Sequence, residues 1–276
     1  MNILTVSLVF ILSCRSENQR AIINRRRELT FFSLVPINII RYLKTQFKNI
    51  ILTYSGGTDS TLLLLLITKF GDLNDLTSIV FNNTRLSSRA QQEYVETVIQ
   101  KLSLTSKFTI IAPEKTRAEL LELIKEDMAS AKDKKHSKHL YRCCVEAKEK
   151  PFIKYLKDND FHNEQTVVLR GIRAFESSMR FNTIMQLIRT GQVYYNRPRY
   201  SRKIFVSNPI FMVPDRYKEI ILKNLCSEFH LPMPVGTGCV ECPIFLKYAS
   251  PEERKGERFQ KTQKRLLGQE ILDDFF

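Results

Sequence analysis

The most constraining feature of this 276-residue chain is a short glycine turn between two apolar runs. Residues 49–54 (NIILTY) form a brief β-rich run, residues 55–60 read SGGTDS, and the apolar segment continues to residue 70. Because paired glycines permit a tight turn, the pattern predicts a strand, a turn and then a helix over 58–70. Amides at the start of such a helix point outwards, and the helix dipole favours a bound anion. The turn is therefore a candidate phosphate-binding loop.

Short apolar strands and amphipathic helices alternate along most of the remaining chain. Strands are predicted at 76–81, 107–111, 165–170, 192–195 and 203–206, helices at 87–102, 117–128, 144–156 and 215–229, and a polar loop at 127–138. This alternation is typical of a parallel sheet covered on both faces. The sequence therefore predicts an α/β fold, a doubly wound Rossmann-like parallel sheet, with a cysteine-bearing C-terminal extension.

Length and composition favour one large domain with appendages, since 43% hydrophobic residues can supply a sizeable core. We expect an N-terminal extension of uncertain structure at 1–38, a nucleotide-binding α/β domain at 39–230 and a C-terminal segment at 231–276. The apolar run at 3–13 has about half the length that a transmembrane helix needs. We therefore expect no membrane association and a cytoplasmic protein.

Basic residues outnumber acidic ones by 43 to 29, which gives a formal charge of +14 and favours phosphate-bearing partners. The excess is concentrated at 170–203, where Glu176 is the one acidic residue among the basic residues Arg170, Arg173, Arg180, Arg189, Arg197, Arg199, Arg202 and Lys203. Three tyrosines interleave with this segment, Tyr194, Tyr195 and Tyr200, and suit either base stacking or packing within a hairpin. Nucleic acid is thus a candidate partner.

Four of the six cysteines form an adjacent pair, Cys143 and Cys144, and a Cys-x-x-Cys at Cys239 and Cys242. Four thiolates suit zinc or an iron–sulfur cluster. A single zinc accommodates adjacent cysteines poorly, because their side chains diverge. Two disulfides or buried thiols are the alternative interpretations. Cys226 lies in a helical pattern and is predicted to be part of the core.

The Ser-Gly-Gly-x-Asp-Ser turn resembles the pyrophosphate-binding loop of the adenine nucleotide α-hydrolase superfamily, the PP-loop ATP pyrophosphatases. Further segments between residues 39 and 244 resemble the phosphoadenylyl-sulfate (PAPS) reductase family. They are Phe81-Asn82-Asn83-Thr84 with Glu93-Tyr94, Arg142-Cys143-Cys144 with Lys148, Gly171-Ile172-Arg173-Ala174-Phe175-Glu176-Ser177 with Arg180, and Gly238-Cys239-Val240-Glu241-Cys242-Pro243. These matches occur in the family's order.

The resemblance implies a site for ATP, PAPS or adenylyl sulfate, with Mg²⁺, and enzyme action at the α-phosphate. Its loop would consist of Ser55, Gly56, Gly57, Thr58, Asp59 and Ser60, joined by Gly171 and Glu176. Asp59 would contact metal or ribose, while Arg173 and Arg180 would neutralise charge at the α-phosphate. The cysteines Cys143, Cys144, Cys239 and Cys242 would hold a [4Fe–4S] cluster, as in adenylyl-sulfate reductases and the DNA-phosphorothioation protein.

Two departures from the reductases favour a different reaction. The tail at 243–276 lacks the cysteine that attacks sulfur in the reductases, and Thr58 stands where they often carry lysine. We therefore expect pyrophosphate release from ATP in support of sulfur transfer, with nucleic acid as a candidate acceptor. A sulfonucleotide reductase and a non-catalytic iron–sulfur nucleic-acid-binding protein are the alternatives. The sulfur donor and the oligomeric state have no signature in the sequence.

Overall fold

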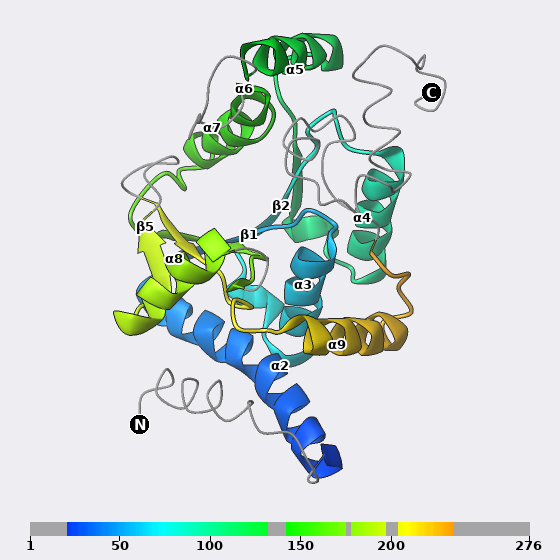
Figure 1. Ribbon diagram of the computed structural model, residues 1–276, viewed down its shortest axis with the longest axis vertical. Coiled ribbons are helices and arrows are strands. Elements are labelled where there is room, and N and C mark those ends of the chain that lie inside the picture. The colour runs from blue at the N-terminus through cyan, green and yellow to red at the C-terminus, as the bar shows by residue number, and fades with distance from the viewer. Residues whose placement is uncertain (1–20, 132–141, 175–177, 197–203, 235–276) are drawn as a thin grey trace. The chain divides into compact units, whose positions relative to one another are not determined.

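The computed structural model describes residues 21–131, 142–174, 178–196 and 204–234 (Figure 1). The chain divides into two compact units. Among the described residues, the first comprises those within 21–54, 58–79 and 163–233, and the second comprises those within 55–57, 80–162 and 234. Residues 55–57 of the predicted phosphate loop belong to the second unit, and residues 58–60 belong to the first.

The strands of the described part form a sheet in the order β3-β2-β1-β4-β6-β5 (Figure 1). Their bounds are Asn49–Thr53 for β1, Ser78–Asn82 for β2, Phe108–Ile111 for β3, Thr166–Arg170 for β4, Tyr194–Asn196 for β5 and Phe205–Ser207 for β6. Strand β4 runs parallel to both β1 and β6, whereas β5 is antiparallel to β6. The predicted, mostly parallel α/β sheet is confirmed.

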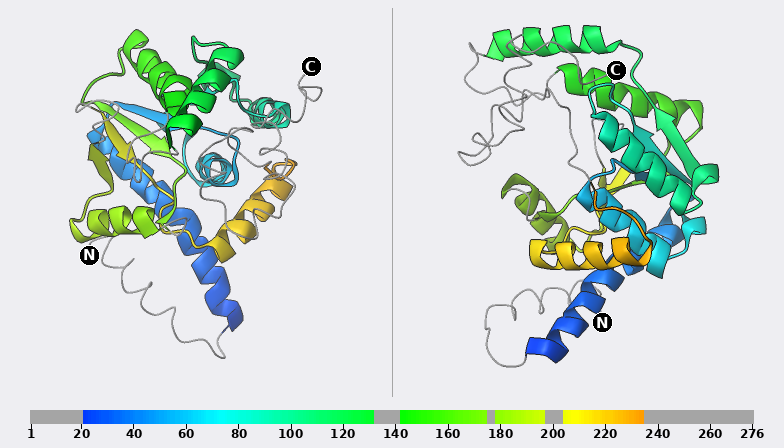
Figure 2. Two further views of the ribbon diagram at one scale, coloured as in Figure 1. Left: turned by 45° about the horizontal axis from the view of Figure 1, so that its top comes forward. Right: turned by 90° about the vertical axis from the view of Figure 1, so that its right-hand side faces the viewer.

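Helices α2, α3 and α9 pack together in the first unit (Figure 2). The helical elements of this unit are α2 Ala21–Gln46, α3 Thr58–Phe70, η1 Leu73–Asp75, α8 Ser178–Arg189 and α9 Asp215–Glu228. Residues 62–67 of α3 are completely buried, as are the central residues of β1 and β4. This core supports the C-terminal end of β1, where the glycine turn begins.

The second unit contains a long helix with a π-helical turn in it. Its elements are α4 Arg89–Lys101, η2 Thr105–Lys107, α5 Arg117–Ala131, α6 Arg142–Cys144, the π-helix η3 Val145–Glu149 and α7 Lys150–Asp158. Elements α6, η3 and α7 follow one another without interruption. A small apolar cluster joins α5 to the start of this helix, and Cys143 belongs to it.

The structure differs from the sequence-based expectations at three helices. Helix α2 runs across the expected boundary at residue 38, and it contains Pro36, a residue that usually ends a helix. Helix α8 occupies part of the basic segment, where the charges obscured the helical spacing. Helix α5 continues to Ala131, so the first residues of the predicted loop at 127–138 are helical. They include alanines and methionine, which favour helix.

Helix α2 is joined to the rest of the first unit by a contact between aromatic rings and by a hydrogen bond. Phe32 is buried and stacks on Tyr217 of α9 with a centroid separation of 4.8 Å. The Tyr217 hydroxyl donates a hydrogen bond to the carboxylate of Glu28. Residues 21–38 of the expected extension are thus joined to the α/β core.

Across the described residues, we find no helix whose length and apolar character would let it cross a bilayer. The apolar run at 3–13 lies outside the described residues.

Candidate active site

The two central parallel strands bring the two main sequence motifs to the same edge of the sheet. In the β1–β4 register, Thr53 pairs with Arg170, and the Thr53 hydroxyl donates to the Leu169 carbonyl at 3.0 Å. The turn that begins at Ser55 and the segment that begins at Gly171 therefore leave neighbouring strand ends. Ligands of open α/β sheets bind outside the carboxyl ends of such strands, where the strand order reverses.

Gly56 is the glycine that the backbone of the turn requires. Its φ of 73° lies in the left-handed region. A Cβ atom at this position would lie 2.6 Å from Cγ2 of Val95 and 3.6 Å from Cδ1 of Tyr94, both on α4. Gly56 therefore shapes the turn and allows it to contact α4.

A glutamine of α4 holds the first residue of the turn. Nε2 of Gln91 donates to the Ser55 carbonyl at 2.6 Å, and the Gly57 amide donates to the Ser55 hydroxyl at a longer 3.4 Å. Helix α3 begins at Thr58, directly after the glycines. The turn therefore leads into a helix N-terminus, the arrangement that favours an anion.

Gly171 permits close contact between the end of β4 and the first turn of α3. A Cβ atom here would lie 2.6 Å from the amide nitrogen of Ser60 and 2.8 Å from the carbonyl carbon of Asp59. Both are backbone atoms, which cannot move aside as a flexible side chain can. Gly171, predicted to take part in nucleotide binding, is in direct packing contact with the predicted phosphate loop.

A buried arginine fixes the acidic residue of the loop. Nε of Arg173 donates to Oδ1 of Asp59 at 2.6 Å, and the two side chains are 4% and 14% exposed. The NH1 group of Arg173 lies 2.8 Å from Oδ1 of Asp215 and 3.3 Å from the Val213 carbonyl. The structure thus brings together the predicted residues Asp59 and Arg173, and it adds Asp215 from the start of α9.

Arg180 lies in a more exposed environment than Arg173. Its side chain is exposed on α8. Partial burial lowers the pKa of the Arg180 guanidinium from its usual value, while the charge of Asp59 raises it and that of Arg173 lowers it. The charges of both Asp59 and Arg173 therefore act on the Arg180 guanidinium. Glu176, the remaining residue predicted from this motif, lies outside the described residues.

The adjacent cysteines begin the helix that contains the π-turn. Cys143 is buried against Leu86, Leu120 and Ile124, and the half-buried Cys144 packs against the same cluster. Neither forms a disulfide with another cysteine of the described residues. Cys239 and Cys242 lie outside the described residues, and within those residues no group of metal-binding side chains is found.

Comparison with known protein families identifies the family to which this chain belongs. Residues 49–211 match the model of the phosphoadenosine phosphosulfate reductase domain. This range is more than half of the chain, and it includes the glycine turn after β1 and the Gly171 segment after β4. The chain belongs to the PAPS reductase domain family. The family resemblance inferred from the sequence motifs is therefore confirmed.

A solved reductase structure agrees with the fold of this PAPS reductase domain. The chain is similar to a phosphate complex of PAPS reductase from Candida auris, with 17% identity and a TM-score of 0.50, over 81% of this chain and 97% of that one. A [4Fe–4S] U34-tRNA thiolase from Methanococcus maripaludis is similar over 86% and 80% of the two chains, with 12% identity and a TM-score of 0.43. Among curated proteins, none matches the sequence.

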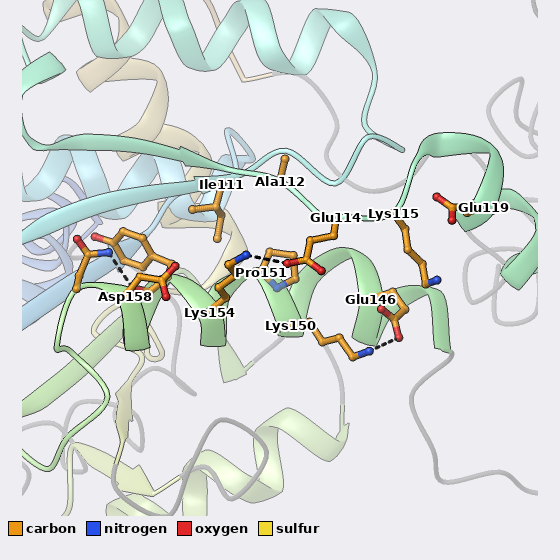
Figure 3. Close-up of a pocket in the computed structure, with 12 residues that line it drawn as sticks. Ile111, Ala112, Glu114, Lys115, Glu119, Glu146, Lys150, Pro151, Lys154 and Asp158 are labelled. Carbon is orange, nitrogen blue, oxygen red and sulfur yellow. Dashed lines mark hydrogen bonds and ion pairs between the residues drawn. The ribbon is translucent and has the colours of Figure 1, made fainter.

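A large groove in the second unit is separate from the residues of the PAPS reductase motifs. It has a volume of about 730 Å³ and lies between α7 and the segment that follows β3 (Figure 3). Four of its charged side chains form two ion pairs, since Lys154 contacts Glu114 at 2.7 Å and Lys150 contacts Glu146 at 2.6 Å. The groove therefore does not mark the candidate active site.

Sequence reasoning did not identify Gln91 or Asp215. Gln91 belongs to a Ser-x-x-Gln pattern in which Ser88 caps α4, and its amide donates to the Ser88 hydroxyl at 3.3 Å. That pattern predicts a helix start but gives no indication that the Gln91 side chain reaches Ser55. Asp215 resembles an ordinary first-turn acidic residue, and only the folded chain places it beside Arg173.

Proposed function

We propose that the protein is an ATP pyrophosphatase that binds an adenine nucleotide at the 55–60 loop and acts at its α-phosphate. Pyrophosphate is the leaving group, and the activated substrate supports sulfur transfer to an acceptor. Nucleic acid is the proposed acceptor, and the cytoplasm the proposed location. Membership of the PAPS reductase domain family supports the nucleotide class.

The observation that carries the proposal is the glycine turn at the junction of β1 and α3. Gly56 has a left-handed backbone, and α3 begins two residues later. The neighbouring strand end contributes Gly171, whose missing side chain lets β4 approach the same helix start. A helix N-terminus with a glycine turn attracts the phosphates of a nucleotide.

The two arginines of the motif take different proposed roles. Because Arg173 is almost completely buried and contacts Asp59, we assign it to positioning the Asp59 carboxylate. Arg180 is exposed and the charge of the same carboxylate acts on it, so it is the residue proposed to meet charge at the α-phosphate. Glu176 is proposed to accept a hydrogen bond from the ribose.

The loop and tail favour ATP over a sulfonucleotide. Thr58 replaces the lysine of many reductases, and residues 243–276 contain no cysteine to attack sulfur. Cys226 does not replace that nucleophile, because it is 2% exposed on α9 and burial raises the pKa of its thiol to about 11. A protonated, buried thiol is a poor nucleophile.

The cysteine pair fits a soft metal group. Cys143 and Cys144 offer sulfur donors in apolar surroundings, and a thiolate donor set of this kind selects iron–sulfur clusters or zinc. We propose that Cys143, Cys144, Cys239 and Cys242 hold a [4Fe–4S] cluster. Such a cluster would supply soft-sulfur binding and redox chemistry when bound. Mg²⁺ is proposed to accompany the phosphates, with Asp59 as an oxygen donor of the type that this ion takes.

The basic segment supports a nucleic-acid acceptor. Arg180 and Arg189 are exposed on α8, as is Phe181, whose side chain can stack on a base. Tyr194 packs instead against Phe47 and Phe205, with centroids 4.9 and 5.3 Å away. For Tyr194, the structure therefore agrees with hairpin packing.

The proposal is tested by measuring pyrophosphate release from ATP by anaerobically purified protein with total cellular RNA or DNA as acceptor. We expect release that is lost in Arg180→Met and retained in Lys44→Met, an exposed lysine outside the basic segment. Thioredoxin-dependent sulfite release from adenylyl sulfate would identify a reductase instead. Nucleic-acid binding without ATP binding would identify the non-catalytic alternative.

A further inference from the structure

Asn82, the last residue of β2, has one buried acceptor that the described residues leave without a hydrogen bond. Its Nδ2 atom donates to the Lys148 carbonyl at 2.9 Å. Its Oδ1 atom is buried and has no partner among the described residues. A buried acceptor without a donor is costly, so such an oxygen at a strand end points to a ligand that supplies the missing donor.

The Lys148 carbonyl belongs to the π-helical turn that follows the cysteine pair. Pro151 explains this turn, because proline has no amide hydrogen and its ring clashes with the carbonyl four residues earlier. The helix widens at Val145–Glu149, where the Lys150 amide donates to the Val145 carbonyl. The Asn82 contact therefore holds an irregular turn directly behind Cys143 and Cys144.

The same part of the second unit is also joined to the phosphate loop. Gln91 on α4 donates to the Ser55 carbonyl, and its neighbour Gln92 donates to Oδ1 of Asn83 at 3.1 Å. The Asn83 amide in turn donates to the Ile111 carbonyl at 2.8 Å. Three side-chain hydrogen bonds, linked by the chain neighbours Gln91–Gln92 and Asn82–Asn83, therefore connect the loop, the end of β2 and the cysteine-bearing helix.

We propose that Asn82 is a positioning residue that connects nucleotide binding to the cysteine pair. Its Oδ1 atom accepts a hydrogen bond from a donor of the bound nucleoside, an amino or a hydroxyl group. That bond fixes the carboxamide, and Nδ2 then holds the π-turn and the two cysteines in one orientation. This inference rests on the proposed nucleotide binding. It assigns to Asn82 the role of transmitting nucleotide binding to the orientation of the two cysteines.

The two sides of the carboxamide are separated by substitution. Asn82→Asp keeps the oxygen but places a second oxygen against the Lys148 carbonyl, so it removes the contact to the π-turn. Asn82→Leu removes both contacts. Asn74→Asp and Asn74→Leu are the matched controls, because Asn74 is exposed in η1. Thermal unfolding of each full-length variant establishes that it is folded.

Hydrogen exchange of the 142–158 segment, with and without ATP, is the decisive measurement. We expect ATP to slow hydrogen exchange at 145–150 in the wild-type protein and in both Asn74 variants. In both Asn82 variants, ATP should no longer slow exchange at these residues. Calorimetry should show that Asn82→Asp binds ATP about as well as the wild type. Asn82→Leu should bind about tenfold more weakly, the effect of one lost hydrogen bond.

Nucleotide analogues identify the donor. The probes are purine riboside triphosphate, which lacks the amino group, and the 2′-deoxy and 3′-deoxy forms of ATP. One of them should bind the wild type about tenfold more weakly than ATP, yet bind Asn82→Leu as well as ATP does. If wild-type protein binds ATP but exchange at 145–150 is unaffected by Asn82→Asp, the inference is wrong and the proposed function stands. If the wild type does not bind ATP, both are overturned.

Discussion

Nε of Arg173 lies 2.6 Å from Oδ1 of Asp59, and this buried contact connects the end of β4 to the first turn of α3. The two residues are 114 positions apart in the sequence. Arg173 also contacts Asp215. One guanidinium therefore joins the first turn of α3, which contains Asp59 of the predicted phosphate loop, to the first turn of α9. The geometry of the candidate site therefore depends on an ion pair that does not itself face the solvent.

Replacing Arg173 should be costly for stability. Arg173→Met removes the ion pair that holds the mostly buried Asp59 carboxylate, and we expect the free energy of unfolding to fall by about 3 kcal/mol. Urea denaturation measures this change. The control is Arg189→Met, an exposed position at which we expect a change of no more than about 0.5 kcal/mol. Equal losses in the two variants would contradict the assigned role of Arg173.

Gly57→Val should abolish nucleotide binding while leaving the chain folded. A Val side chain would occupy space beside the amides that are proposed to meet phosphate, but the left-handed backbone falls on Gly56, not on this residue. Calorimetric titration with ATP and a thermal unfolding curve together test the prediction. Unchanged ATP affinity would contradict the phosphate-loop assignment.

Gly56→Ala should instead lower stability, because it combines backbone strain with a contact of 2.6 Å to Val95. We expect a loss of about 2–3 kcal/mol in the free energy of unfolding. Gly191→Ala is the control, since Gly191 has a similar φ of 69° and should lose only about 1 kcal/mol. Adding Val95→Ala to Gly56→Ala should restore part of the difference, and no restoration would show that the clash is not the cause.

Anaerobically purified protein should be brown and contain about four irons per chain. Cys143→Ser or Cys144→Ser should remove the colour, since each takes away one proposed thiolate. Cys226→Ser should retain it, because Cys226 is buried on α9 and belongs to neither the Cys-Cys pair nor the Cys-x-x-Cys. Iron, sulfide and zinc analysis measures the content. Stoichiometric zinc without iron would falsify the cluster assignment.

Cys226 should make stability fall at high pH. Burial raises the pKa of its thiol from 9.0 to about 11, so the folded state disfavours the thiolate. The contribution of the protonated Cys226 thiol to the free energy of unfolding is complete below pH 9. About 2 kcal/mol of it is lost as the pH rises towards 11. Comparing urea denaturation of the wild type and Cys226→Ala across this range isolates the effect. Parallel pH profiles would show that the thiol is not desolvated.

The local pattern of the chain determined most of the elements around the site. The alternation of apolar residues and the glycine turn predicted α3 with the bounds observed and β1 and β4 within one residue, because burial on both faces of a parallel sheet imposes continuous apolar runs. The order of the motifs also indicated the family. Helix α2 was not predicted, since Pro36 interrupts the local pattern although packing of Phe32 on Tyr217 stabilises the helix.

Only the tertiary structure decided which polar side chains meet. The sequence marked Asp59 and Arg173 as separate members of two motifs, but pairing of β1 with β4 was needed to bring them within hydrogen-bond distance. The contacts of Gln91 with Ser55 and of Asn82 with Lys148 likewise join segments that lie 36 and 66 residues apart. Local propensity specifies helices and strands, whereas contacts between distant side chains form only after the core has fixed the distance and direction between elements. For this reason the sequence predicted a phosphate loop, and the fold identified the residues that hold that turn in place.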